Sequence, residues 1–125
     1  MPPLNSMNVA VIGASDKPER YSYQAVKLLQ EKGHKVYPVH QRVKTIDGVP
    51  VFSSIKDIVD PIDTVSMYIA SDISEHLTDD ILAKKPRRII FNPGAENRQL
   101  ALKAQTVGAE TVEACTLVML RTGQF

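Results

Sequence analysis

Residues 9–22 read VAVIGASDKPERYS, and this stretch decides the fold. Val9–Ile12 is a short, continuous apolar run that stops at Gly13, which predicts a strand buried on both faces, as in a parallel sheet. The helix that follows, with Ser22 as its expected N-cap, carries apolar residues at helical spacing and ends near Gly33.

The rest of the chain alternates strand and helix patterns. The expected strands are His34–Val39, Asp63–Ile69, Arg88–Phe91 and Glu110–Glu113, with a short extended piece at Val49–Phe52. The expected helices are a short one capped by Ser53 or Ser54 and ending at Val59, then Ser71–Lys85 and Glu96–Val107. This alternation predicts an α/β, Rossmann-like three-layer sandwich with a doubly wound, mostly parallel sheet of about five strands. Ligands of such sheets bind at the carboxyl ends of the strands, near the point where the strand order reverses.

Composition fits one globular domain over residues 1–125, with 43% hydrophobic and 23% charged residues. Fifteen Lys and Arg stand against 14 Asp and Glu, so net charge gives no reason to expect nucleic acid or a membrane surface as a partner. We expect no signal peptide and no membrane span. The single cysteine, Cys115, excludes an internal disulfide, and a cytoplasmic location is the expectation.

The turn Gly13-Ala14-Ser15 stands between the first strand and its helix, which favours a phosphate-binding loop. Glycine lets the backbone approach a ligand closely, and a helix N-terminus offers free N–H groups to an anion. Ser15 adds a hydroxyl, and Arg20 adds a guanidinium. A plain strand–helix turn with a surface arginine is the alternative.

The loop departs from the dinucleotide fingerprint, because the later glycines of G-x-G-x-x-G are replaced by Ser15 and Pro18. The second strand ends VYPVHQR, without the acidic residue that holds a ribose 2′-hydroxyl, and offers His40, Arg42 and Lys44 instead. This pattern favours a ligand with an additional phosphate near the ribose over NAD, the alternative being a solvated basic loop.

Several segments together resemble the small stand-alone CoA-binding proteins, which share the CoA-binding domain of the succinyl-CoA ligase alpha subunit. The resemblance runs from about Asn8 to Leu120 and rests on GAS-x5-YS, VYPVHQR, IDGVPVFSSIKDI, FNPGAENRQL and EACTLVML. Where these proteins commonly have V-N-P-[KR], this chain reads Val39-His40-Gln41-Arg42 and so keeps the basic residue.

The resemblance implies a role for each matching residue. The pyrophosphate is expected to be held from the backbone by Gly13, Ala14 and Ser15, and the loop to be closed over it by Arg20, Tyr21 and Ser22. The adenosine is expected between Val39 and His40, with its 3′-phosphate on Arg42. The pantetheine path is expected along Tyr68 and Ile69, and the far wall at Pro93 and Gly94.

The expected function is therefore binding of coenzyme A or an acyl-CoA by a non-catalytic binding or sensing module. One alternative is an NAD(P)-binding oxidoreductase or redox sensor. Another is a protein-interaction domain with a vestigial nucleotide cleft. The apolar tail Leu117–Leu120 is expected either to pack on the sheet or to form a homodimer contact.

Other reactive or charged residues are expected to have structural roles. Cys115 precedes an apolar run and is expected to be a small packed residue. His34 and His76 are expected in solvent, and the histidines and Cys115 lack metal-ligand spacing. The basic cluster is expected to be a solvated helix end that complements the helix dipole; it comprises Lys84, Lys85, Arg87 and Arg88.

Overall fold

A computed structural model describes residues 6–125, which build a five-stranded parallel sheet and its covering helices. The strands are β1 (Asn8–Ile12), β2 (Lys35–Val39), β5 (Thr64–Met67), β6 (Arg88–Phe91) and β7 (Glu110–Glu113). Their spatial order is β2-β1-β5-β6-β7, and each neighbouring pair is parallel. The chain leaves β1 toward β2 and then crosses back to β5, so the order reverses between β1 and β5. The predicted fold class is confirmed.

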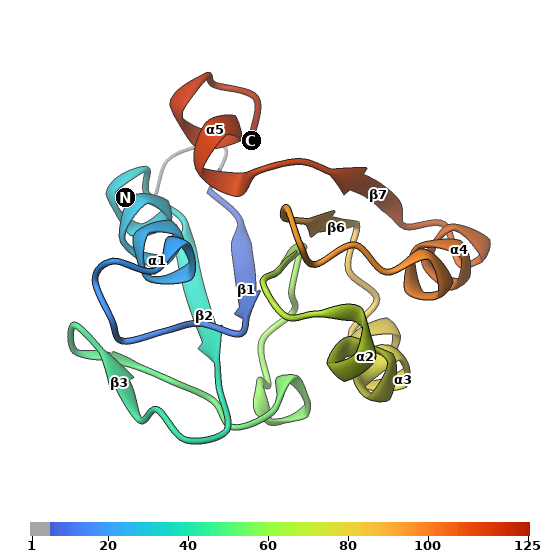
Figure 1. The fold of residues 1–125 in the computed structure, drawn as a ribbon, viewed down its shortest axis with the longest axis horizontal. Helices are drawn as coiled ribbons and strands as arrows, with labels where there is room; N and C mark the ends of the chain where they lie inside the picture. The colour runs from blue at the N-terminus through green and yellow to red at the C-terminus, as the bar shows by residue number, and fades with distance from the viewer. Residues whose placement is uncertain (1–5) are drawn as a thin grey trace.

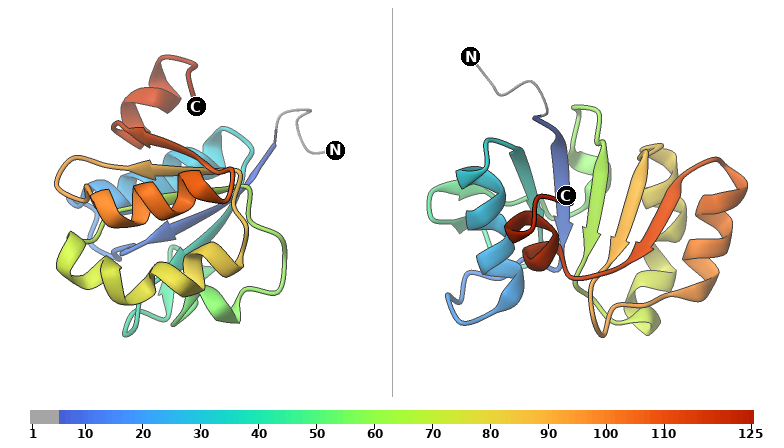
Figure 2. Two further views of the ribbon diagram at one scale, coloured as in Figure 1. Left: turned by 90° about the vertical axis from the view of Figure 1, so that its right-hand side faces the viewer. Right: turned by 90° about the horizontal axis from the view of Figure 1, so that it is seen from above.

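Helices cover both faces of this sheet (Figures 1 and 2). One face carries α1 (Tyr21–Glu31) and α5 (Thr116–Arg121). The other carries α2 (Ser71–Ser74), α3 (Thr78–Ala83) and α4 (Arg98–Thr106), with the 3-10 helices η1 (Ile55–Asp57) and η2 (Glu75–Leu77). A small antiparallel hairpin, β3 (Thr45–Ile46) and β4 (Val49–Pro50), follows β2.

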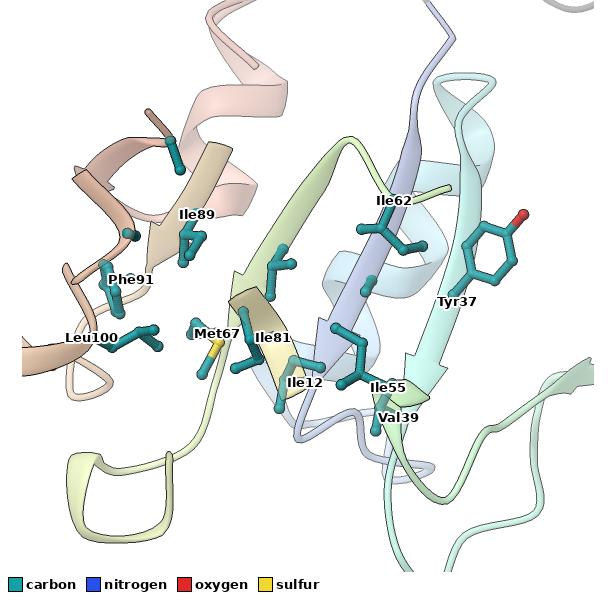
Figure 3. Close-up of a cluster of buried hydrophobic side chains, with 14 of the residues drawn as sticks. Ile12, Tyr37, Val39, Ile55, Ile62, Met67, Ile81, Ile89, Phe91 and Leu100 are labelled. Atoms are coloured by element: carbon teal, nitrogen blue, oxygen red, sulfur yellow. The ribbon is translucent and has the colours of Figure 1, made fainter. Parts of the chain in front are cut away.

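Alternation along β1 divides the core into two layers. Val9 and Val11 join the cluster beneath α1 and α5, which includes Leu29. Ala10 and Ile12 point the other way. Figure 3 shows this second cluster, in which Ile12 and Met67 of the sheet lie near Ile81 of α3. Because core layers cover both faces of β1, its residues Val9–Ile12 are all apolar and buried.

The first helix begins before its expected cap. Arg20 occupies the N-cap position of α1, and no side chain there accepts a hydrogen bond. Ser22 lies inside the first turn and is 6% exposed, so the prediction that Ser22 caps the helix is wrong. Ser54, by contrast, caps η1 by accepting a hydrogen bond from the Lys56 N–H at 3.2 Å.

The helix expected over Ser71–Lys85 is broken into α2, η2 and α3. Ser74 faces the core, where its hydroxyl accepts a hydrogen bond from Asn97 Nδ2 at 2.6 Å. Ser74 is the buried residue of α2, and Ile73, which was expected on the buried stripe, is 55% exposed. A buried polar contact to a residue far along the chain thus overrides the local apolar pattern.

Arg88 is buried, and its assignment to a solvated basic cluster is wrong. Its guanidinium donates to Thr64 Oγ1 at 3.3 Å and to the Phe125 carbonyl at 3.3 Å, and it lies 4.5 Å from the Phe125 ring centroid. His34 is also less solvated than expected, because its Nδ1 accepts a hydrogen bond from the Met7 N–H and its ring contacts Phe125. His76 is exposed, as expected.

A buried polar network joins the carboxyl end of β6 to its neighbours. Asn92, 1% exposed, donates through Nδ2 to Ser66 Oγ at 3.0 Å and to the Met67 carbonyl at 2.7 Å. Its Oδ1 accepts from the Thr116 N–H at 2.8 Å. This network fixes the start of α5, whose Leu120 packs in the α1 layer, so the tail covers the sheet. A homodimer contact stays a prediction.

Asn92→Ala should lower the free energy of unfolding by on the order of 2–3 kcal/mol, because it leaves buried donors and acceptors without partners. Urea denaturation measures the change. Gln105→Ala is the control, since Gln105 makes an exposed hydrogen bond to Thr111, and should cost less than about 0.5 kcal/mol. Equal losses in the two variants would contradict this role of Asn92.

Burial, aided by the nearby Arg88 charge, lowers the pKa of His34. In the unfolded chain a histidine binds a proton near about pH 6.5, so acidification through that value favours the unfolded state. The protein should therefore lose stability as the pH falls from 7 toward 5. His34→Asn, which keeps an acceptor for the Met7 N–H, should flatten this slope. Unfolding at a series of pH values tests both, and an unchanged slope in His34→Asn contradicts the assignment.

Candidate functional site

Two adjoining cavities open where β1 and β2 end, and Gly13 and His40 line both. We call the first the loop cavity, of about 650 Å³, and the second the apolar cavity, of about 350 Å³. Tyr68, just after β5, lines the loop cavity, and Ile69 lines the apolar one. The site therefore lies at the reversal of strand order, where doubly wound sheets bind ligands.

The loop cavity is polar and carries both signs of charge. Its charged side chains are Asp16, Lys17, Glu19 and Arg20. The remaining lining is Gly13, Ala14, Ser15, Tyr21, Ser22, His40, Val43 and Tyr68. Two cations beside two carboxylates give no net excess of positive charge, so selection of an anion here depends on local geometry.

The start of the loop is tied to β2. The N–H groups of Gly13 and Ala14 both donate to the Val39 carbonyl, at 3.0 and 3.2 Å. They are thereby occupied, and the implied backbone contact of Gly13 and Ala14 with a pyrophosphate does not fit this geometry. Ser15 makes the next turn, in which its Oγ accepts from the Lys17 N–H at 3.1 Å.

The N-terminus of α1 supplies the donors that the loop start does not. The first N–H groups of a helix have no partner within it, and no side chain caps α1. Tyr21 and Ser22 of this first turn line the loop cavity, as does Arg20 at the N-cap. Free N–H groups, the positive end of the helix dipole and a guanidinium thus meet at one cavity, which is the setting that phosphate binding needs.

Gly13 allows β1 and β5 to approach at the point where the cavities meet. It has φ +86°, and a Cβ at this position would lie 2.5 Å from Ile69 Cγ2 and 3.3 Å from the Tyr68 carbonyl carbon. Both the left-handed conformation and the lack of space require glycine here.

The apolar cavity has a different chemistry. Its hydrophobic lining consists of Ile12, Val39, Ile55, Ile69, Ile73 and Leu77. Polar side chains come from Ser53 and Ser54, and from the segment after β2, His40-Gln41-Arg42. Arg42 is exposed to solvent and brings the guanidinium of this lining. An apolar wall with a cation beside it suits a flat, uncharged group that carries an anion.

A short hairpin sets the course of the segment after β2. Its turn is Asp47-Gly48, both at positive φ, and Ile46 beside the turn is fully buried. Asp47 accepts a hydrogen bond from the Tyr23 hydroxyl and forms a 3.0 Å ion pair with Lys27, which ties the hairpin to α1. These contacts lower the pKa of Asp47, the Tyr23 hydrogen bond most of all, so the carboxylate stays charged at neutral pH.

Tyr68 is the tyrosine through which β5 reaches the loop cavity. Its hydroxyl oxygen is buried and has no hydrogen-bond partner among residues 6–125. Burial raises the pKa of Tyr68 far above the ordinary value, so the phenol is neutral. Its ring forms part of the wall of the loop cavity.

The structure brings together most of the residues expected from the sequence. Eleven of the thirteen line one of the cavities: Gly13, Ala14, Ser15, Arg20, Tyr21, Ser22, Val39, His40, Arg42, Tyr68 and Ile69. Pro93 and Gly94 line neither. Instead the Gly94 N–H donates to the Glu96 carboxylate at 3.0 Å.

Other lining residues were not expected from the sequence. The acidic pair Asp16 and Glu19 belongs to the predicted loop itself, so its place was open to inference. Ile55, Ile73 and Leu77 come from separate short helices. For these three, the only signal was their nearness to the carboxyl ends of predicted strands.

Among residues 6–125, no group of three or more His, Cys, Asp or Glu residues is placed to hold a metal ion. No helix formed by those residues is both long and apolar enough to cross a membrane. Cys115 is half-buried at the N-cap position of α5 and lines neither cavity.

Comparison with known proteins gives a consistent result. The model of the CoA-binding domain family matches residues 7–121. The chain is 34% identical over 77 residues to the uncharacterized protein YneT of Bacillus subtilis. This match covers 62% of this chain and 57% of YneT. It is 42% identical over 67 residues to the ADP-forming acetate–CoA ligase II subunit alpha of Pyrococcus furiosus, covering 53% of this chain and 15% of that subunit. A crystal structure of an uncharacterized protein matches with a TM-score of 0.91 and 34% identity, over 96% of this chain and 98% of that one.

Gly13→Ala should lower the free energy of unfolding by on the order of 2–4 kcal/mol, because it adds crowding against Ile69 to left-handed backbone strain. Gly94→Ala is the matched control: Gly94 has φ +89°, but a Cβ added there would meet nothing within 4 Å, so it should lose only about 1–2 kcal/mol. Urea unfolding of both variants gives the difference. Equal losses would show that β1 and β5 do not need this close approach.

Proposed function

The chain belongs to the CoA-binding domain family, and we propose that it binds coenzyme A or an acyl-CoA in the two cavities that meet at Gly13, as a binding or sensing module. The family resemblance seen in the sequence is thereby confirmed. The observation that carries the proposal is the pairing of a polar cavity at a helix N-terminus with an apolar cavity beside Arg42.

The loop cavity supports the proposed pyrophosphate position. Because the Val39 carbonyl occupies the N–H groups of Gly13 and Ala14, the phosphates would be held by the first turn of α1, with Ser15 and Arg20 beside it. Lys17 adds a second cation. Charge-assisted hydrogen bonds of this kind are among the stronger contacts that a binding site offers.

The apolar cavity supports the proposed adenosine position. Val39 and His40 line it on the β2 side, and Ile55 and Leu77 line it from the short helices that cover the same face of the sheet. An adenine ring is flat and largely apolar, so it suits such walls. Arg42 is then the residue for the ribose 3′-phosphate, which distinguishes CoA from NAD.

The pantetheine arm would leave along Tyr68 and Ile69. Both residues follow β5 and flank Gly13, so they lie between the two cavities. Pro93 and Gly94 are further along the sheet, and we propose no contact of theirs with the nucleotide.

A binding role without catalysis is the simplest use of this site. Tyr68 is a neutral phenol, and the free thiol of Cys115 lies outside both cavities. The ligase subunit that the chain resembles is a far longer protein, since the match covers 15% of it.

CoA should stabilise the protein, by about 2.7 kcal/mol at a concentration 100 times its Kd. Thermal unfolding with CoA, NAD and NADP measures the effect, and CoA should give the largest shift. A shift with NAD or NADP but none with CoA contradicts the proposed function.

Dephospho-CoA, which lacks the 3′-phosphate, should bind roughly tenfold more weakly than CoA if the exposed Arg42 contacts that phosphate. Arg42→Ala should abolish this difference, and titration calorimetry measures it. Lys44→Ala is the matched control, because Lys44 is a basic neighbour that lines neither cavity, and it should preserve the tenfold preference. If only Lys44→Ala lost the preference, the 3′-phosphate would be in contact with Lys44 and not with Arg42.

A further inference from the structure

His40 occupies the wall that the two cavities share, at the point where β2 ends. Its side chain also makes a specific local contact. Nδ1 accepts hydrogen bonds from the backbone N–H of Arg42 at 3.0 Å and from that of Val43 at 3.1 Å.

These two hydrogen bonds fix the chemical form of the ring. A nitrogen that accepts hydrogen bonds carries no proton, so the ring is neutral and its proton is on Nε2. Within the part of the chain that is described, Nδ1 is the acceptor found for both N–H groups.

The two hydrogen bonds to His40 Nδ1 shape the turn that directly follows β2. Val39 still pairs with β1, and the His40 N–H still donates to the Phe52 carbonyl at 2.9 Å. Beyond it the chain turns, because the N–H groups of Arg42 and Val43 point back to the His40 ring. Arg42 is exposed and lies within this turn. The backbone conformation of the turn therefore determines the position of the Arg42 Cα, from which the side chain extends.

We propose that His40 is a positioning residue, whose Nδ1 shapes the turn that places Arg42 at the apolar cavity. The inference rests on the proposed function in that Arg42 is taken to contact the 3′-phosphate of CoA. It assigns His40 a role in ligand discrimination that acts through Arg42 and the backbone, beyond forming a wall for the adenosine.

Two substitutions separate the two nitrogens of the ring. His40→Asn places an amide oxygen at about the position of Nδ1, so it keeps the acceptor and removes Nε2. His40→Gln carries an amide nitrogen near the position of Nε2 and lacks the acceptor at Nδ1. Comparison of the two variants distinguishes an effect of His40 through the turn from direct contact of His40 with the ligand.

The experiment measures Kd for CoA and for dephospho-CoA by titration calorimetry with wild type, His40→Asn, His40→Gln and the double variant His40→Gln/Arg42→Ala. We expect His40→Asn to keep the roughly tenfold preference for CoA. His40→Gln should reduce the preference to about one, whatever its effect on the affinity for dephospho-CoA, because His40 also lines the cavity that would hold the ligand. The double variant should lose nothing more than His40→Gln, since both changes remove the same contact.

A readout without ligand tests the turn directly. Long-range ¹H–¹⁵N NMR spectra at pH 7.5 should show His40 with its proton on Nε2, and the amides of Arg42 and Val43 should exchange more slowly in wild type and His40→Asn than in His40→Gln. This measurement stands whether or not any variant binds CoA.

Three results would overturn the proposal: a proton on Nδ1, a CoA preference kept by His40→Gln, or a preference lost equally by His40→Asn and His40→Gln. Equal loss of both affinities in His40→Gln is a case of the second result, because the preference is then kept and the damage to the site is general. Absence of CoA binding by wild type, with the Nε2 proton and slow amide exchange present, instead rejects the proposed function and leaves the turn intact.

Discussion

The close approach of Gly13 to the end of β5, together with its N–H bond to β2, is the constraint on which the site depends. The Gly13 and Ala14 N–H groups share the Val39 carbonyl, while the space beside Gly13 is filled by Ile69. Three strand ends are thereby held together at the reversal of strand order. Both cavities are lined by Gly13 and His40, so the boundary between them lies at these two residues.

The same constraint divides the chemistry of the site. Since the loop start is turned toward Val39, the donors that remain for an anion belong to the N-terminus of α1 and to the side chains around it. The apolar cavity is built from the other layer, where Ile55 and Leu77 approach the sheet. A ligand with phosphates, a flat base and a further phosphate matches this division, and the proposal of CoA as the ligand rests on that match.

Buried polar contacts hold the frame around the site. The Asn92 side chain joins Ser66 of β5 to the first residue of α5, and Asn97 both caps α4 and bonds to Ser74. In a buried setting such bonds are costly to break, so they fix particular arrangements. The hairpin turn at Asp47 forms an ion pair with Lys27 of α1. This contact also restrains the His40–Arg42 segment, which leads into the hairpin.

The sequence by itself determined the fold class and the place of the loop, because a buried strand, a glycine turn and an amphipathic helix are local patterns. It also determined that Arg42 follows β2 and that Ser53 or Ser54 caps a short helix, and the structure identifies Ser54 as the cap. Tertiary structure alone decided that Arg88 is buried, that Ile73 faces outward and that the Gly13 and Ala14 N–H groups are occupied. Each of these depends on partners distant in the sequence (Phe125, Asn97 and Val39), and spacing within one segment does not encode which distant group will complete a hydrogen bond.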